Sequence, residues 1–325
     1  MTTRLFTFGC SFTNYGWATW ADIMGQEFTE HQNWGQCGAG NLFILCSLME
    51  AIQKESISKD DTVAIMWSSI TREDRWINGE WITPGTVFNP GSTDMFSEEW
   101  LKKYADPLGY LIRDLALVSA AVLSLEKIGC KYHMLSMMPF DVPSEVSETF
   151  LKKIKSKFNL WSGAITNTIE KELDKKKDDV MSMYSDMIDK IRPSVFEVIF
   201  NRDWYSRKGF KQQTWAELSY RENIKTWAPH WPPYEEFIKG EVDDANVLDE
   251  IKQCYDIEDI QSFITEIKRF ENRDDVHPTP LEHLEYLEKV LPEFSISDAT
   301  RIWTEQQHLN AEKGIEFNSK LVDRL

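Results

Sequence analysis

Three short apolar segments in the first half of the chain most constrain its fold. They cover residues 5–8, 61–67 and 132–138, and each has the length of a buried strand. Residues 17–28 and 41–53, which lie between them, carry apolar side chains at helical spacing. Alternating strands and helices are typical of a parallel sheet covered by helices on both faces. We therefore expect an α/β chain with a flavodoxin-like three-layer α/β/α fold around a mostly parallel central sheet.

The pattern of the rest of the chain predicts how it is divided. Residues 1–140 and 272–292 form the expected α/β domain. Residues 141–271 are charged, rich in aromatic side chains and mainly helical in pattern, which predicts a large insertion subdomain. Residues 293–325 are polar and predict a helical C-terminal tail.

Two local elements are also expected within the first 140 residues. The pair Asn78-Gly79 separates two short runs that contain Trp76 and Trp81, which predicts a hairpin with a type I′ turn. A long helix is expected within residues 97–127, with an interruption near residues 107–109.

Composition limits the classes of function. The chain has 325 residues with 42% hydrophobic and 27% charged side chains, which fits a globular protein, and a net charge of -17, which disfavours nucleic-acid binding. Its five cysteines show no CxxC spacing, so we expect neither a disulfide framework nor a metal site, and no cofactor. We expect no signal peptide and no membrane span, and hence a protein that is cytoplasmic as synthesised.

The first candidate catalytic residue is Ser11, in the sequence Gly9-Cys10-Ser11-Phe12-Thr13 directly after the first apolar segment. A serine in this place lies at the carboxyl edge of the predicted sheet, where open α/β sheets bind ligands. A serine hydroxyl is a poor nucleophile and needs a base within hydrogen-bond reach. The alternative is a serine that caps a turn or helix.

The second candidate is His277, which follows Asp274 by three residues. This spacing allows a carboxylate to reach the imidazole and fix its tautomer, as in a nucleophilic triad. The adjacent Asp275 is an alternative orienting group, and a plain turn is the alternative for the whole motif. Pro280 predicts that a helix begins immediately afterwards.

Glycines are concentrated in residues 33–41, and they mark a third candidate element. Gly35, Gly38 and Gly40 allow the backbone to turn N–H groups toward an anion or a developing oxyanion. A plain strand-to-helix turn, with Asn41 as the N-cap, is the alternative. The spacing does not match a dinucleotide-binding fingerprint.

These three elements together resemble the SGNH, or GDSL-type, hydrolase superfamily. Residues 9–13 resemble its Gly-Asp-Ser block with Cys10 in place of aspartate, residues 33–38 match Asn-X-Gly-X-X-Gly, and residues 274–278 match Asp-X-X-His-Pro. The resemblance covers about residues 1–140 and 272–292 and implies a Ser11–His277–Asp274 triad. It also implies an oxyanion hole that includes the backbone of Ser11 and Gly38. The start of the chain looks like divergent members encoded by bacteriophages and marine bacteria.

One block of the superfamily is missing. The family places an oxyanion-hole asparagine after a central strand, but the corresponding segment here contains Trp67, Ser69 and Arg72 and no asparagine. Loss of one oxyanion donor lowers the rate by about 10²–10³. Substitutes on this sequence are a donor from Ser69 or Asn41, or the charge of Arg72.

The sequence therefore supports two functions. The first is a serine ester hydrolase, with a carbohydrate O-acyl ester as the preferred substrate and Arg72, Trp67, Trp204 and Trp227 as candidate substrate contacts. The alternative for the aromatic residues of the insertion is that they form the hydrophobic core of that subdomain. The second is a weakly active or inactive SGNH-fold protein with a structural or binding role, such as a viral particle or appendage component. In such a particle, or in a homo-oligomer, the aromatic insertion and the polar tail would form the interface between subunits.

Overall fold

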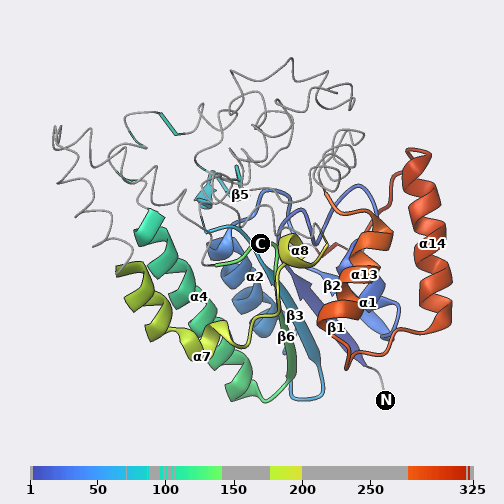
Figure 1. Ribbon diagram of the computed structural model, residues 1–325, viewed down its shortest axis with the longest axis horizontal. Coiled ribbons are helices and arrows are strands. Elements are labelled where there is room, and N and C mark those ends of the chain that lie inside the picture. Colours follow the sequence, from blue (N-terminus) through green and yellow to red (C-terminus); the bar gives the residue numbers. More distant parts are fainter. Residues whose placement is uncertain are drawn as a thin grey trace, which may run out of the picture.

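The centre of the molecule is a four-stranded parallel sheet with the strand order β2-β1-β3-β6 (Figure 1). Its strands are β1 (Arg4–Phe8), β2 (Glu30–Asn33), β3 (Thr62–Trp67) and β6 (Lys131–Ser136). The computed structural model describes residues 3–70, 72–85, 87, 96–97, 100, 104, 107–140, 176–199, 277–319 and 321–322. All three strand pairs are parallel, which confirms the predicted α/β class.

The sequence did not predict β2. Its residues Glu30, His31, Gln32 and Asn33 are polar, and only Asn33 is fully buried. An edge strand of this kind carries no apolar signal, because its stability comes from the backbone pairing with β1. The helix expected over residues 17–28 is correspondingly shorter, since α1 covers only Trp20–Gly25 and the chain then turns into β2.

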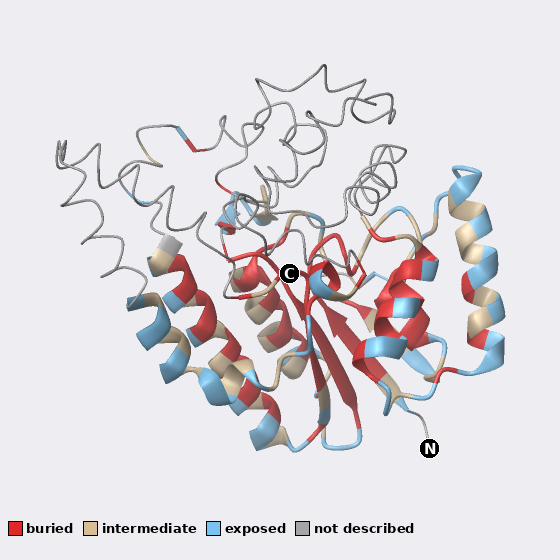
Figure 2. Cartoon of the chain, viewed as in Figure 1, coloured by how far each residue is buried: buried red, intermediate tan, exposed pale blue. Residues whose placement is uncertain are grey.

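Helices cover both faces of the sheet (Figure 1). α2 (Asn41–Lys54) and α4 (Pro107–Ile128) lie together on one side, whereas α1 and α13 (Pro280–Val290) lie on the other. Figure 2 shows that buried residues line the sheet and the helix faces that meet it. The strand residues of β1 and β3 after Arg4 are buried, because the sheet has helices on both sides.

The described part of the helix expected within residues 97–127 agrees with the prediction. Trp100 and Tyr104 are helical, and α4 begins at Pro107, where an interruption was expected and where a proline favours the first helical position. Its segment Leu108–Ile128 is the one described stretch long and apolar enough to cross a bilayer by length and composition. Leu115, Val118 and Val122 are fully buried in the core of the α/β domain, and a core helix meets the same criteria.

Two described segments outside the first 140 residues pack against this domain. Within the range expected for the insertion, residues 176–199 include α7 (Ser185–Ile188) and α8 (Val195–Val198), and Ile191 forms a parallel bridge with Met134. Val195 and Phe196 belong to the main core. In the tail, α14 (Asp298–Glu312) contacts α13, and Leu321 bridges Asn33 at the edge of β2.

The hairpin is present as β4 (Arg75–Ile77) and β5 (Glu80–Ile82). Asn78 and Gly79 both have positive φ angles, as a type I′ turn requires. Trp76 and Trp81 form a cross-strand pair with perpendicular rings. The hairpin lies above the carboxyl ends of the central strands (Figure 1).

Acidic pH is expected to destabilise this fold through two buried histidines. Burial lowers the pKa of His133 to about 4 and that of His283 to about 3, from an ordinary value of 6.5. Below pH 6.5 the unfolded chain binds protons at these two histidines, whereas the folded chain does not. The free energy of unfolding is therefore at its full value above pH 6.5, and it decreases as the pH falls toward the pKa of the folded state. The loss reaches about 1.4 kcal/mol per pH unit for each group.

Urea denaturation at pH 7, 6 and 5 measures this effect. We expect the His133→Gln and His283→Gln variants to lose less of their free energy of unfolding between pH 7 and pH 5 than the unmodified protein. Each variant is compared with itself at the two pH values, so the packing cost of the substitution cancels. Equal slopes in the unmodified protein and both variants would contradict the prediction.

Candidate active site

The candidate site lies at the carboxyl end of β1, where the strand order changes direction. β1 pairs with β2 on one side and with β3 on the other, and ligands of open α/β sheets bind in the crevice at such a point. Ser11 follows the end of β1 by three residues. Its side chain is 5% exposed, so it is largely shielded from bulk water.

A tight turn holds Ser11 in place. The N–H groups of Thr13 and Asn14 both donate to the Cys10 carbonyl, at 2.9 and 3.1 Å. Gly9 permits this turn, because a Cβ atom at this position would lie 2.0 Å from Thr13 Oγ1 and 3.0 Å from the carbonyl oxygen of Met66. The turn therefore packs directly onto the end of β3.

His277 meets Ser11 across this edge of the sheet. The distance between His277 Nε2 and Ser11 Oγ is 2.8 Å, although 266 positions separate the two residues in the chain. This is the contact that a base needs in order to accept a proton from a serine nucleophile. A neutral imidazole accepts the hydroxyl hydrogen at Nε2 in this arrangement.

Aromatic side chains and a hydrogen bond hold the segment that carries His277. The ring of Tyr15 stacks on the imidazole with 3.8 Å between ring centroids, and the ring of Phe12 lies 5.2 Å away. Trp17 Nε1 donates to the Pro278 carbonyl at 2.8 Å. Directly after this segment, Thr279 caps α13. The loop that carries Ser11 therefore also positions its partner.

In the ester hydrolysis that the resemblance to SGNH hydrolases implies, we expect a Trp17→Phe variant to lower kcat about tenfold with little change in KM. The variant keeps an aromatic ring but removes the donor to Pro278, and such a bond contributes about 1 kcal/mol. The larger part of the effect arises because a small displacement of His277 weakens its contact with Ser11. Steady-state kinetics on p-nitrophenyl acetate provide the measurement. An unchanged kcat would show that this bond does not position His277.

Asn33 and Gln36 attach the glycine-rich loop to the Ser11 turn. Asn33 Oδ1 accepts from the Gly35 N–H at 2.9 Å, and Asn33 Nδ2 donates to the Thr13 carbonyl at 2.8 Å. The Gln36 N–H donates to the Gly9 carbonyl at 3.0 Å. The second and first sequence blocks are therefore neighbours in space.

Gly38 occupies a position that only glycine fits. Its φ angle is +76°, and a Cβ atom there would lie 2.0 Å from the carbonyl oxygen of Thr83, which follows the hairpin. The Ser11 N–H donates to no other residue in the part of the chain that the structure describes. The Gly38 N–H donates to the thiol of the neighbouring Cys37, which is a weak acceptor, so an oxyanion would have to replace this contact.

Asn41 has a different role from the one suggested by the sequence. Its Nδ2 group donates to the Ser68 carbonyl at 3.1 Å and to Asp114 Oδ2 at 2.8 Å, and its Oδ1 accepts from the Ser68 N–H at 2.8 Å. Both amide hydrogens are occupied, so the side chain has none left for an oxyanion. Asn41 instead fixes the loop after β3. Burial raises the pKa of Asp114 to about 7.

Two serines follow β3 in this loop. Both Ser68 and Ser69 are buried. The Ser68 hydroxyl has no hydrogen-bond partner among the described residues, so it is an available donor that was not predicted from the sequence. Its position directly before Ser69, at the end of the same strand, was the signal for it.

Arg72 brings a buried positive charge to the same region. Its side chain is 4% exposed, its Nη1 donates to the Ala39 carbonyl at 2.9 Å, and its Nη2 lies 3.8 Å from Met137 Sδ. Cys10 Sγ lies 3.7 Å from the same sulfur atom. Arg72 Nε has no hydrogen-bond partner, and no ion pair joins Arg72 to a carboxylate among the described residues. Its charge acts on the nearby Asp74 carboxyl, whose pKa burial raises and Arg72 lowers, and it favours negative charge in this region.

The remaining candidate residues are one buried tryptophan and three residues outside the described ranges. Trp67 is fully buried in the hydrophobic core, so its side chain offers no surface to a ligand, and we correct its assignment as a substrate contact. Asp274, Trp204 and Trp227 lie outside the described residues. The described ranges contain no group of three His, Cys, Asp or Glu side chains that could hold a metal ion.

The comparisons with known proteins add no family to this geometry. The chain matches no protein-family model, no curated protein and no solved structure. Its candidate active site is therefore defined by the contact between Ser11 and His277 and by the two loops around it.

Proposed function

We propose that this protein is a serine ester hydrolase. The observation that carries the proposal is the 2.8 Å distance between Ser11 Oγ and His277 Nε2 at the carboxyl edge of the parallel sheet. The strand order β2-β1-β3-β6 agrees with the first four positions of a flavodoxin-like sheet. It supports the flavodoxin-like three-layer fold that we propose for the α/β domain, with a helical insertion within residues 141–271. The resemblance to SGNH hydrolases gives the same reaction class.

In the proposed mechanism, His277 Nε2 accepts the proton of Ser11 as its Oγ attacks the ester carbonyl carbon. The C–O π bond opens into a tetrahedral oxyanion, and the N–H groups of Ser11 and Gly38 donate to it. When the intermediate collapses, the C–O bond to the alcohol breaks and His277 returns the proton to the leaving oxygen. Water then repeats the sequence on the acyl-enzyme. Asp274 is the proposed orienting group for the imidazole.

The buried charge of Arg72 provides a physical substitute for the missing asparagine. Its guanidinium group contacts the Ala39 carbonyl, which directly follows Gly38, so a positive charge stands behind the oxyanion loop. The low dielectric of the protein interior makes this electric field stronger than it would be in water.

We propose that the enzyme acts without a metal or cofactor. Its proposed substrate is a carbohydrate O-acyl ester rather than a nucleic acid or a membrane lipid. Its proposed location is the cytoplasm or a viral particle.

A fluorophosphonate probe tests the nucleophile directly, because it forms a covalent bond only with an activated serine. We expect mass spectrometry to locate the label on Ser11, and we expect His277→Gln to slow labelling strongly. Ser124→Ala is a matched control, since this serine on α4 only donates to the Ala120 carbonyl at 2.7 Å, and its labelling should be unchanged. A folded protein in which Ser11 remains unlabelled, and which hydrolyses no ester in a broad panel, would overturn the proposal.

A further inference from the structure

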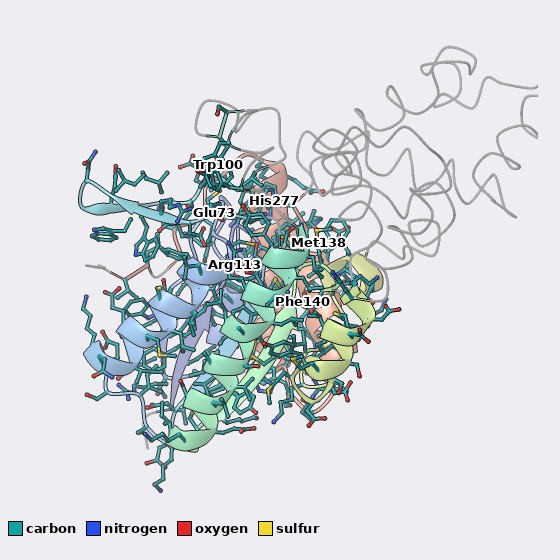
Figure 3. All side chains as sticks on the ribbon, turned by 90° about the vertical axis from the view of Figure 1, so that its left-hand side faces the viewer. Glu73, Trp100, Arg113, Met138, Phe140 and His277 are labelled. Atoms are coloured by element: carbon teal, nitrogen blue, oxygen red, sulfur yellow. The ribbon has the colours of Figure 1, made fainter. Side chains whose placement is uncertain are left out.

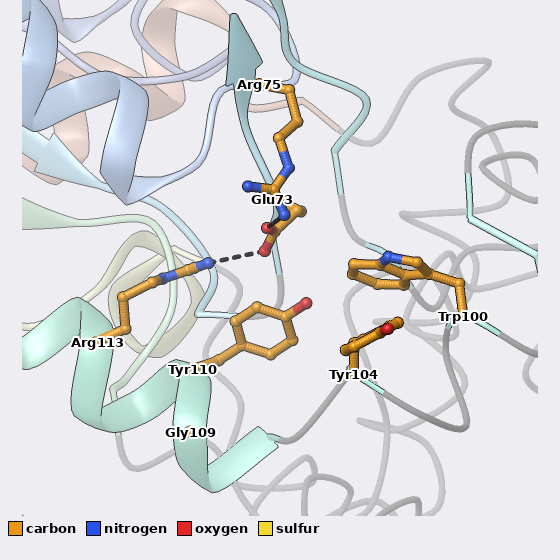
Figure 4. A pocket seen from close by; sticks show the side chains of 7 residues that line it. All are labelled: Glu73, Arg75, Trp100, Tyr104, Gly109, Tyr110 and Arg113. Atoms are coloured by element: carbon orange, nitrogen blue, oxygen red, sulfur yellow. Dashed lines mark hydrogen bonds and ion pairs between the residues drawn. The ribbon is translucent and has the colours of Figure 1, made fainter.

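A second feature with the properties of a ligand site lies beside the candidate active site. It is a pocket of about 430 Å³ at the N-terminal end of α4 (Figure 4). Seven residues line it: Glu73, Arg75, Trp100, Tyr104, Gly109, Tyr110 and Arg113. Its volume is within the range of small-molecule sites. None of these residues takes part in the proposed hydrolysis.

One side of the pocket is a rigid charged frame. Glu73 pairs with Arg75 and, at 2.9 Å, with Arg113 Nη1. Arg113 is fixed further by Asp114, at 2.6 Å, and by the Arg72 carbonyl, at 2.8 Å. Arg75 is about half exposed and contributes only one described ion pair. Glu73 is buried and also accepts a hydrogen bond from Tyr110, so its carboxylate is largely occupied. The frame therefore presents mainly the guanidinium donors of Arg75, which retain unused hydrogen-bonding capacity.

The other side of the pocket is aromatic. Trp100 packs against Phe96 with 4.7 Å between ring centroids and against Tyr104 with 5.7 Å. Tyr110 lies under the guanidinium group of Arg113, at 4.5 Å. Figure 4 shows the rings of Trp100, Tyr104 and Tyr110 on the side of the pocket away from the backbone of Arg75. Aromatic and charged groups thus face a shared space.

The pocket is connected to the candidate active site through adjacent residues. Arg72 reaches the Ala39 carbonyl in the glycine-rich loop, and the next residue, Glu73, lines the pocket. Figure 3 shows Glu73, Trp100 and His277 at the same end of the molecule. A ligand in the pocket would therefore lie near the edge of the sheet that carries Ser11.

We propose that this pocket binds a neutral pyranose sugar. A pyranose has an apolar C–H face that stacks on aromatic rings and an edge of hydroxyl groups that both donate and accept hydrogen bonds. The guanidinium donors of Arg75 bind the hydroxyl oxygens of such an edge, and the rings of Trp100 and Tyr104 accept its C–H face. An acyl chain would remove these charged groups from water without replacing their hydrogen bonds, which is unfavourable. The charges of Arg75 and Arg113 are already balanced by Glu73 and Asp114, so the frame offers no excess positive charge to a phosphate.

The inference goes beyond the proposed hydrolysis and does not depend on it. Binding of a sugar requires no nucleophile, so it is measured with the full-length Ser11→Ala variant, in which no turnover is expected. If the protein proves to have no esterase activity, the measurement of sugar binding is unaffected. If it binds no sugar, the proposed esterase activity is likewise unaffected.

The test uses saturation-transfer NMR and tryptophan fluorescence with the methyl glycosides of glucose, galactose, mannose and N-acetylglucosamine. We expect at least one of them to bind saturably with a Kd of about 1 mM, which corresponds to about -4 kcal/mol. Trp100→Ala should weaken this binding at least tenfold, and Trp100→Phe should restore most of it. Arg75→Ala, at a half-exposed position, should weaken it severalfold.

Trp76→Ala is the matched control. Trp76 is an exposed tryptophan next to Arg75 on β4, and successive strand residues point to opposite faces, so its loss should leave the Kd unchanged. If Trp100→Ala fails to fold, the comparison of the Kd values of Arg75→Ala and Trp76→Ala still tests the proposal. Absence of saturable glycoside binding would overturn the proposal, as would equal effects of Trp76→Ala and Arg75→Ala. Tighter binding of octanoate or adenosine in the same pocket would also overturn it.

Discussion

Replacing Ser11 with alanine is expected to lower kcat for ester hydrolysis by at least about 10⁴-fold. The loss is large because the hydroxyl 2.8 Å from His277 Nε2 is the proposed nucleophile, and alanine leaves no oxygen to attack the ester carbonyl. Residual activity above that of water would come from the oxyanion donors and from substrate binding alone. Steady-state kinetics with p-nitrophenyl acetate and acetylated sugars measure the change.

The fold of this variant should be retained. Ser11 donates and accepts no described hydrogen bond other than the one to His277, and an alanine side chain fits the same space. We expect the circular dichroism spectrum and the urea midpoint to be close to those of the unmodified protein. Ser124→Ala, the α4 control, should retain full activity. Equal activity of Ser11→Ala and the unmodified protein would exclude Ser11 as the nucleophile.

Replacing Gly38 with alanine is expected to damage both the fold and the catalysis. A residue with a side chain at a φ of +76° costs about 1–2 kcal/mol, and here the added Cβ atom also meets the Thr83 carbonyl oxygen at 2.0 Å. Backbone cannot move aside as a flexible side chain does, so the loop must shift. The proposed oxyanion donor moves with it, and we expect kcat to fall by about 10²–10³.

Gly314→Ala separates the two causes of this effect. Gly314 also has a positive φ, +69°, but a Cβ atom there would meet nothing within 4 Å. We expect Gly314→Ala to show only the conformational cost in urea denaturation, with unchanged kinetics, and Gly38→Ala to show a larger loss of stability together with the loss of kcat. If both variants keep full activity, the Gly38 loop is not part of the oxyanion hole.

The parts of the fold that were predictable are those with a strong local signal. β1, β3 and β6 are apolar, and Asn78-Gly79 has the turn chemistry that the hairpin requires. β2 was missed because its polar residues pair only through the backbone at an edge. Local sequence carries no signal for such pairing, which depends on a neighbouring strand.

The candidate site shows the same division. The sequence indicated Ser11 and His277 as chemically suitable residues. Its glycines indicated the loop over residues 33–41, and the resemblance to SGNH hydrolases pointed to Gly38 within that loop. It also suggested Asn41 as an oxyanion donor, although the structure shows that this amide is occupied by Ser68 and Asp114. Hydrogen-bond partners of this kind come from different elements, so residue type alone does not reveal which donors remain available.

By itself, the sequence determined the α/β class and a serine that follows the first strand. Apolar periodicity and turn chemistry are local properties, and they are sufficient for those conclusions. Only the tertiary structure decided that His277 lies 2.8 Å from Ser11 and that Glu73, Trp100 and Arg113 line one pocket. These contacts join distant segments, and they form only because burial of the apolar strands and helix faces brings their ends to one edge of the sheet.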